Sequence, residues 1–169
     1  MKTLVVLLAQ VLPLLVPAAA AVVRLTLPRT TKVALGVQAV VSLIVALALI
    51  QVAGALHTDP RPFAVDPTLT PFFAHPADNG FPSDHTALAA TVALLVMMYR
   101  KRVGVVLLTA SVIGGAARVV AHVHHTQDIA AGVLIAASSV ALTAALWRWA
   151  RRRLPRGVVG ETALDVEVS

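Results

Sequence analysis

The sequence predicts an all-α fold, a polytopic membrane bundle of about five transmembrane helices with a Pro-rich outer loop. Of its 169 residues, 58% are hydrophobic and only 13% are charged, and the mean hydropathy is +0.84. Soluble domains have about 25% charged residues. The apolar residues form long uncharged runs without the alternating pattern of a membrane β-barrel. Because lipid offers no partner for backbone polar groups, these runs are expected to be helices.

Five uncharged runs define the expected helices in order along the chain. The runs at 3–23, 33–56 and 129–147 have about the 20 residues that a membrane span needs. The runs at 86–99 and 103–117 are shorter, so we expect their helices to include polar flanking residues. The first run also resembles a cleavable signal peptide. Cleavage would force the cations at 24, 29 and 32 across the membrane, so we expect the first helix to be retained.

The basic residues are separated by membrane side. With the N-terminus outside, eleven of the fourteen Lys and Arg residues fall in three inner segments, at 24–32, 100–102 and 148–156. This distribution follows the positive-inside rule, and it argues against nucleic acid as the reason for the net charge of +6. All six histidines and five aspartates fall on the other side. We therefore expect a plasma-membrane protein with its active site on the extracytoplasmic face.

The outer loop, residues 56–82, carries six of the ten prolines, which exclude helix through most of it. We expect it to cap the outer ends of the helices. Ser83 is the predicted N-cap of the next helix, with Asp84, His85 and Thr86 in its first turn. We expect residues 1–156 to form one membrane-embedded domain and residues 157–169 a short cytoplasmic tail.

Arg118, His124 and Asp128 stand in the polar stretch before the last run. Ionisable groups beside a span are costly to keep, and this combination suits phosphoryl transfer. Arg118 and His124 are six residues apart and would face opposite sides of one helix, so the helix must end between them, at 122–127. Asp128 is four residues after His124, close enough to orient its ring. His122 shares the helical face of Arg118, and spacing alone does not choose between the histidines.

Three blocks of this polar sequence resemble the signature of the type 2 phosphatidic acid phosphatases, a family of metal-independent lipid and acid phosphatases. The match covers residues 61–128 and keeps the order and spacing of the family pattern. The blocks are Arg61-Pro62, then Pro82-Ser83-Asp84-His85, then Ala117-Arg118 with His124 and Asp128. The resemblance implies a hydrolase of phosphoric or diphosphoric anhydrides or monoesters that needs no metal or other cofactor.

The resemblance also implies a role for each matching residue. His124 would attack phosphorus to give a phosphohistidine, Asp128 would orient its ring, and His85 would protonate the departing oxygen. The remaining residues would bind the phosphate through guanidinium groups and the N–H groups of a helix N-terminus. These substrate-binding residues are Arg61, Ser83, Asp84 and Arg118.

Three positions depart from the family pattern. The family lysine falls at Gly54, so one phosphate-binding cation is missing, and His57 is near enough in sequence to replace it. The family serine is Ala117. The family glycine is Asp84, whose carboxylate would repel a phosphate.

The flanking residues resemble the bacterial undecaprenyl pyrophosphate phosphatase branch, which acts on the polyprenyl carrier at the outer membrane face. They are Arg61-Pro62-Phe63, the segment from Phe81 to Thr86, and His75, Asp78 and Asn79 between them. We expect a lipid phosphate as substrate, with phosphatidylglycerol phosphate or phosphatidate as alternatives. Membrane lipids are the other expected partners, and the sequence leaves the oligomeric state undetermined.

A different class of function is a histidine-rich metal-binding membrane protein, because His122, His124, His125 and Asp128 have the density of a ligand set. The chain has no cysteine, so a thiolate site is excluded. A proton-coupled transporter would need ionisable residues deep within its spans, and none lies near the middle of the five runs.

Overall fold

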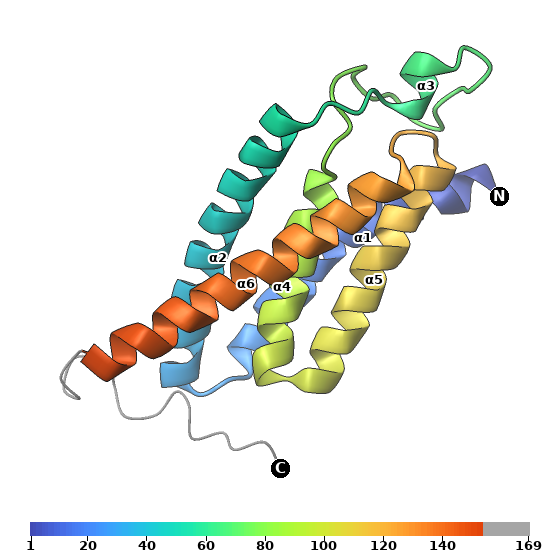
Figure 1. Cartoon of the computed structure of the whole chain (residues 1–169). Coiled ribbons are helices and arrows are strands. Elements are labelled where there is room, and N and C mark those ends of the chain that lie inside the picture. The colour runs from blue at the N-terminus through green and yellow to red at the C-terminus, as the bar shows by residue number, and fades with distance from the viewer. Residues whose placement is uncertain (154–169) are drawn as a thin grey trace.

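A computed structural model describes residues 1–153, and these residues form six α-helices and no β-strand. The short helix α3 lies in the outer loop, whereas the other helices run up and down as a bundle (Figure 1). The helices are α1 (Lys2–Leu25), α2 (Arg29–Leu56), α3 (Pro62–Val65), α4 (Asp84–Tyr99), α5 (Lys101–Val120) and α6 (Thr126–Arg153). The predicted all-α fold is confirmed. The tail expected at 157–169 lies outside the described residues.

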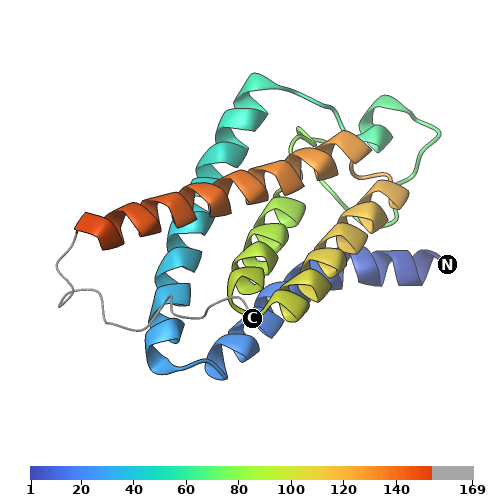
Figure 2. The same ribbon diagram turned by 60° about the horizontal axis from the view of Figure 1, so that its bottom comes forward.

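Four of these helices, α1, α2, α5 and α6, are long and apolar enough to cross a membrane, as expected of a multi-pass membrane protein. The remaining long helix, α4, has 16 residues and extends about 24 Å at about 1.5 Å per residue. A hydrocarbon core is about 30 Å thick. The position of α4 accounts for its length, because it lies among α1, α2, α5 and α6 (Figure 2). The expected fifth helix is therefore present, but it is surrounded by protein.

Small residues bring the helices together around α4. Its buried Ala89 and Ala93 pack in one cluster with Val16 of α1 and Leu107 of α5. A Cβ atom at Gly132 of α6 would lie 2.9 Å from the carbonyl oxygen of Ser83. Glycine therefore lets α6 approach the first turn of α4, where the polar residues gather.

The two ends of the bundle differ in their charge. The α1–α2 connection, the α4–α5 connection and the C-terminal end of α6 lie at one end, and they carry the basic residues at 24–32, 100–102 and 148–153 (Figure 1). The outer loop and the α5–α6 turn lie at the other end. A hydrogen bond holds the loop against the end of α5, because the Phe72 N–H donates to the Ala121 carbonyl at 3.2 Å. The loop thus caps this end, as predicted.

Candidate active site

The turn between α5 and α6 determines where the candidate nucleophile lies. α5 ends in a Schellman motif, in which the N–H of His122 donates to the Val119 carbonyl (3.0 Å) and that of Val123 to the Arg118 carbonyl (3.1 Å). His122 has a φ of 64°, the left-handed conformation that this motif requires at the residue after the C-cap. The helix therefore ends between Arg118 and His124, as the spacing predicted, and the chain turns back toward Arg118.

His124 and Asp128 form a buried pair at the start of α6. The Nδ1 of His124 lies 3.1 Å from the Asp128 Oδ2, and the two side chains are only 2% and 0% exposed. The same carboxylate oxygen accepts the His125 N–H at 2.7 Å, which satisfies a free donor at the helix N-terminus. Since a carboxylate accepts the Nδ1 hydrogen, the Nε2 of His124 is left without one and is free to act as a nucleophile.

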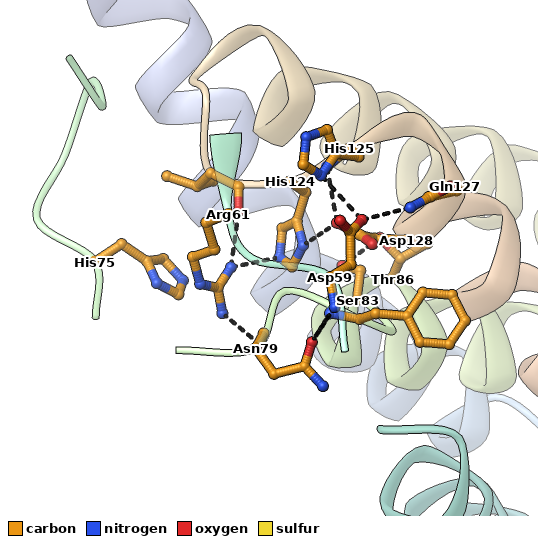
Figure 3. A network of polar contacts seen from close by, with 12 residues as sticks. Asp59, Arg61, His75, Asn79, Ser83, Thr86, His124, His125, Gln127 and Asp128 are labelled. Carbon is orange, nitrogen blue, oxygen red and sulfur yellow. Dashed lines mark hydrogen bonds and ion pairs between the residues drawn. The ribbon is translucent and has the colours of Figure 1, made fainter. Parts of the chain in front are cut away.

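Arg61 faces that nitrogen. Its NH1 lies 3.4 Å from the Nε2 of His124 and donates to the Val123 carbonyl at 2.8 Å. Its Nε donates to Asp78 at 2.8 Å, and this hydrogen bond lowers the pKa of Asp78. The guanidinium group is thus fixed beside His124 by the loop and by the α5–α6 turn (Figure 3).

Arg118 is the second buried cation, with 3% exposure. Its guanidinium carbon lies 6.0 Å from the ring centre of Phe73. Unlike Arg61, it has two nitrogens, Nε and NH1, that are buried without a hydrogen-bond partner among the described residues. Leaving a buried donor unpaired costs about 1–3 kcal/mol. An anionic ligand would satisfy these donors.

The start of α4 contributes the third block. Ser83 is the N-cap residue, as predicted, but its hydroxyl forms no capping bond to the backbone. The hydroxyl pairs instead with that of Thr86 at 3.1 Å, while the Ser83 N–H donates to the Asp128 carbonyl at 3.1 Å. This last bond fixes the first turn of α4 against that of α6. Asp84 and His85 are exposed beside it, and His85 forms no side-chain hydrogen bond with described residues.

Asn79 organises the loop around these residues, a role that the sequence did not assign. Its Oδ1 accepts the N–H groups of Asp59 (2.9 Å) and Phe81 (3.1 Å). Its Nδ2 donates to the carbonyls of Gly54 and His57, each at 3.1 Å. One side chain therefore joins the end of α2, the segment that carries Arg61 and the segment that enters α4.

Position 54, where the family lysine would fall, is closely packed. A Cβ atom at Gly54 would lie 3.2 Å from the carbonyl oxygen of Phe81, so a longer side chain there would require the Phe81 backbone to shift by a few tenths of an ångström. His57, the expected replacement, is exposed and packs edge-on against Phe81, with 4.6 Å between ring centres. We find no contact between His57 and His124 within the described residues.

A possible metal-ligand group differs from the set that the sequence suggested. Atoms of Asp59, His125 and Asp128 lie within 4.8 Å of one another. In the structure these groups are engaged with protein, since Asp59 Oδ2 lies 2.9 Å from His125 Nδ1 and accepts a hydrogen bond from Gln127 at 2.6 Å. Burial opposes ionisation of Asp59, but the Gln127 hydrogen bond and the His125 charge lower its pKa overall. His122 is directed elsewhere, toward the Thr70 carbonyl at 3.1 Å.

Apolar grooves open along the bundle, and two of them reach residues at its polar end. The first, of about 350 Å³, runs between α1, α2 and α4 and has Asp84 and His85 among its lining residues. Its apolar wall includes Leu14, Leu43 and Leu88. The second, of about 680 Å³, lies between α5 and α6 and is lined by apolar residues and Thr126. Of these two grooves, only the first includes predicted site residues, Asp84 and His85.

Fold and site together define a multi-pass helical membrane protein with a buried histidine–aspartate pair and two arginines at one end of the bundle. Residues 35–153 match the PAP2 superfamily. The chain belongs to this family, which confirms the resemblance seen in the sequence.

Two relatives are similar to part of the chain. The bacitracin transport permease protein BcrC of Bacillus licheniformis is 38% identical over 110 residues, which cover 64% of this chain and 54% of the relative. The undecaprenyl-diphosphatase BcrC of Bacillus subtilis (strain 168) is 27% identical over 81 residues, which cover 48% of this chain and 42% of the relative. The chain thus spans about half the length of these curated relatives. No solved structure matches it.

Proposed function

We propose that the protein is a metal-independent membrane phosphatase that hydrolyses a lipid pyrophosphate, with undecaprenyl pyrophosphate as its substrate, through a phosphohistidine. The observation that carries this proposal is the buried His124–Asp128 pair, whose free Nε2 lies 3.4 Å from the NH1 of Arg61. Membership of the PAP2 superfamily supports phosphatase activity. The name of the Bacillus subtilis relative supports the substrate.

In the first step the Nε2 of His124 attacks phosphorus. The bond from phosphorus to the leaving oxygen breaks, and His85 gives that oxygen a proton. Asp128 stabilises the positive charge that develops on the imidazole ring. Arg61 and the unpaired N–H groups of Arg118 neutralise the charge on the phosphoryl oxygens. With two fixed cations in these positions, the reaction needs no metal.

In the second step water attacks the phosphohistidine. His85, now without its proton, takes one from the water, and the P–N bond breaks to release inorganic phosphate. Both nitrogens of His124 thereby return to their starting state. Asp128 keeps the Nδ1 hydrogen in place through both steps, because it accepts that hydrogen at 3.1 Å.

The groove between α1, α2 and α4 is the proposed site of the lipid tail. Leu88 lies three residues after His85 and so on the same side of α4, and both line this groove. A tail held there would place the leaving oxygen beside His85. A lipid can enter sideways from the membrane, because the groove opens along the bundle. Phosphatidylglycerol phosphate and phosphatidate are the alternative substrates of the same arrangement.

The distribution of charge supports an extracytoplasmic active site. The basic residues at 24–32, 100–102 and 148–153 lie at the end of the bundle opposite the outer loop (Figure 1), and basic residues favour the cytoplasmic side. The site, at the loop end, would then face outward in the plasma membrane. We also propose that residues 1–156 act as a single membrane-embedded domain.

The nucleophile is tested by phosphate release from undecaprenyl pyrophosphate in detergent, with EDTA present. We expect His124→Ala to lower the rate by about a thousandfold or more, because the attacking group is lost. His122→Gly is the matched control, since glycine readily adopts the φ of 64° found there, and it should keep nearly full activity. Full activity in the His124 variant would contradict the mechanism, and loss of wild-type activity in EDTA would contradict metal independence.

The tail site is tested by filling each groove in turn. We expect Leu88→Trp to raise KM for the lipid substrate about tenfold, equivalent to about 1.4 kcal/mol of lost binding, while hydrolysis of a short soluble phosphate ester stays unchanged. Val133→Trp fills the α5–α6 groove instead and should leave both reactions unchanged. If the Val133 variant alone impaired lipid hydrolysis, the tail would belong in the other groove.

The membrane orientation is tested by cysteine labelling, since the chain has no cysteine of its own. A membrane-impermeant maleimide should label Thr68→Cys, in the outer loop, on intact cells. Thr30→Cys, near the α1–α2 connection, should react only after lysis. Both threonines are exposed, so the pair differs in membrane side and not in accessibility within the protein. The reverse labelling would place the site on the cytoplasmic face.

A further inference from the structure

His75 lies beside the proposed nucleophile, although neither composition nor spacing gave it a role. Its ring centre is 6.2 Å from that of His124, with the rings nearly perpendicular. Figure 3 shows the imidazole of His75 directed toward Arg61, which itself faces the Nε2 of His124. A phosphoryl group bound at that nitrogen would therefore lie within reach of His75.

The surroundings of His75 hold its ring in place and leave one nitrogen available. Its Nδ1 lies 3.3 Å from the carbonyl oxygen of Pro76, so this nitrogen carries a hydrogen and donates it. Phe73 lies against the ring, with 6.2 Å between centres, and also lies beneath Arg118. The Nε2 of His75 has no hydrogen-bond partner among the described residues, so it is available to a ligand.

The charges around the site indicate that the Nε2 of His75 could donate to a bound phosphate. Arg61 and Arg118 are the buried cations of the site, and the glycine at position 54 supplies no third cation. Burial and the charge of Arg61 lower the pKa of His75, so the ring is neutral before substrate binds. A phosphate placed beside the arginines reverses the local field and favours the imidazolium form, which donates from both nitrogens.

We propose that His75 is a substrate-binding residue that donates a hydrogen bond from its Nε2 to a phosphoryl oxygen, in place of the cation absent at position 54. This inference rests on the proposed phosphatase function, because it requires phosphate beside His124. The outer loop then has two roles, since the segment that covers the site also supplies a ligand to the substrate.

The test uses the full chain in detergent and measures the binding of inorganic pyrophosphate by calorimetry, alongside KM and kcat for the lipid. We expect His75→Phe, which keeps a planar ring but has no N–H, to weaken pyrophosphate binding and to raise KM, each about tenfold or more. Its kcat should change much less. His75→Lys, which restores a cation without the ring, should bind pyrophosphate within about threefold of the wild type.

His57→Phe is the matched control, because His57 is exposed and packs against Phe81 away from His124. It should behave as the wild type. A purely structural role for His75 predicts the opposite order, with His75→Phe normal and His75→Lys impaired, and that order would overturn the inference. Absence of pyrophosphate binding by the wild type would also overturn it. Pyrophosphate binding that depends on His75, without lipid turnover, would instead contradict the proposed function alone.

Discussion

The hydrogen bond between His124 Nδ1 and Asp128 Oδ2 is the interaction on which the site depends. Both groups are buried, so each would be costly without the other. The pair requires α5 to end sharply, which the Schellman motif at His122 achieves. It also requires α6 to begin immediately after the turn. Asp128 stabilises that start, because its carboxylate accepts the N–H of His125 at the helix N-terminus. One carboxylate therefore starts a helix and fixes which nitrogen of His124 carries its hydrogen.

The two arginines differ in how the protein holds them. Arg61 has protein partners at Asp78 and at the Val123 carbonyl, which fix its position beside His124. Arg118 keeps buried donors that the described residues leave unpaired. The first arginine is thus oriented by the protein alone, whereas the second has donors that could bind an anion. In the proposed mechanism, such preorganisation would avoid reorientation of charge during the reaction. Asn79 also holds the loop in a fixed position, because its four hydrogen bonds join the segments on either side of Arg61.

The helices and the break between α5 and α6 follow from local sequence, whereas the contacts between residues far apart in the chain do not. The long apolar runs and the basic segments were sufficient to predict the helices, and the six-residue spacing of Arg118 and His124 required the break that the structure shows. The short run at 86–99 indicated a short helix, but the position of α4 inside the bundle could not be predicted, because it depends on the four helices that surround it. The contacts of Asp78, Asn79 and His75 were also missed. Each of these residues lies against a residue 17 or more positions away, and nothing in the local pattern indicates such a partner. The hydroxyl of Ser83 was expected to cap α4, but it forms a hydrogen bond with the hydroxyl of Thr86 instead.

The central claim is that His124 becomes phosphorylated during turnover. The most direct measurement is rapid quenching of the full chain after mixing with undecaprenyl pyrophosphate that carries a radioactive terminal phosphate, followed by peptide mapping. The mechanism predicts transient label on the peptide that contains His124, formed and lost at rates compatible with kcat, and no label in His124→Ala. Label on another residue, or phosphate release with direct attack by water and no labelled protein at any time, would contradict it.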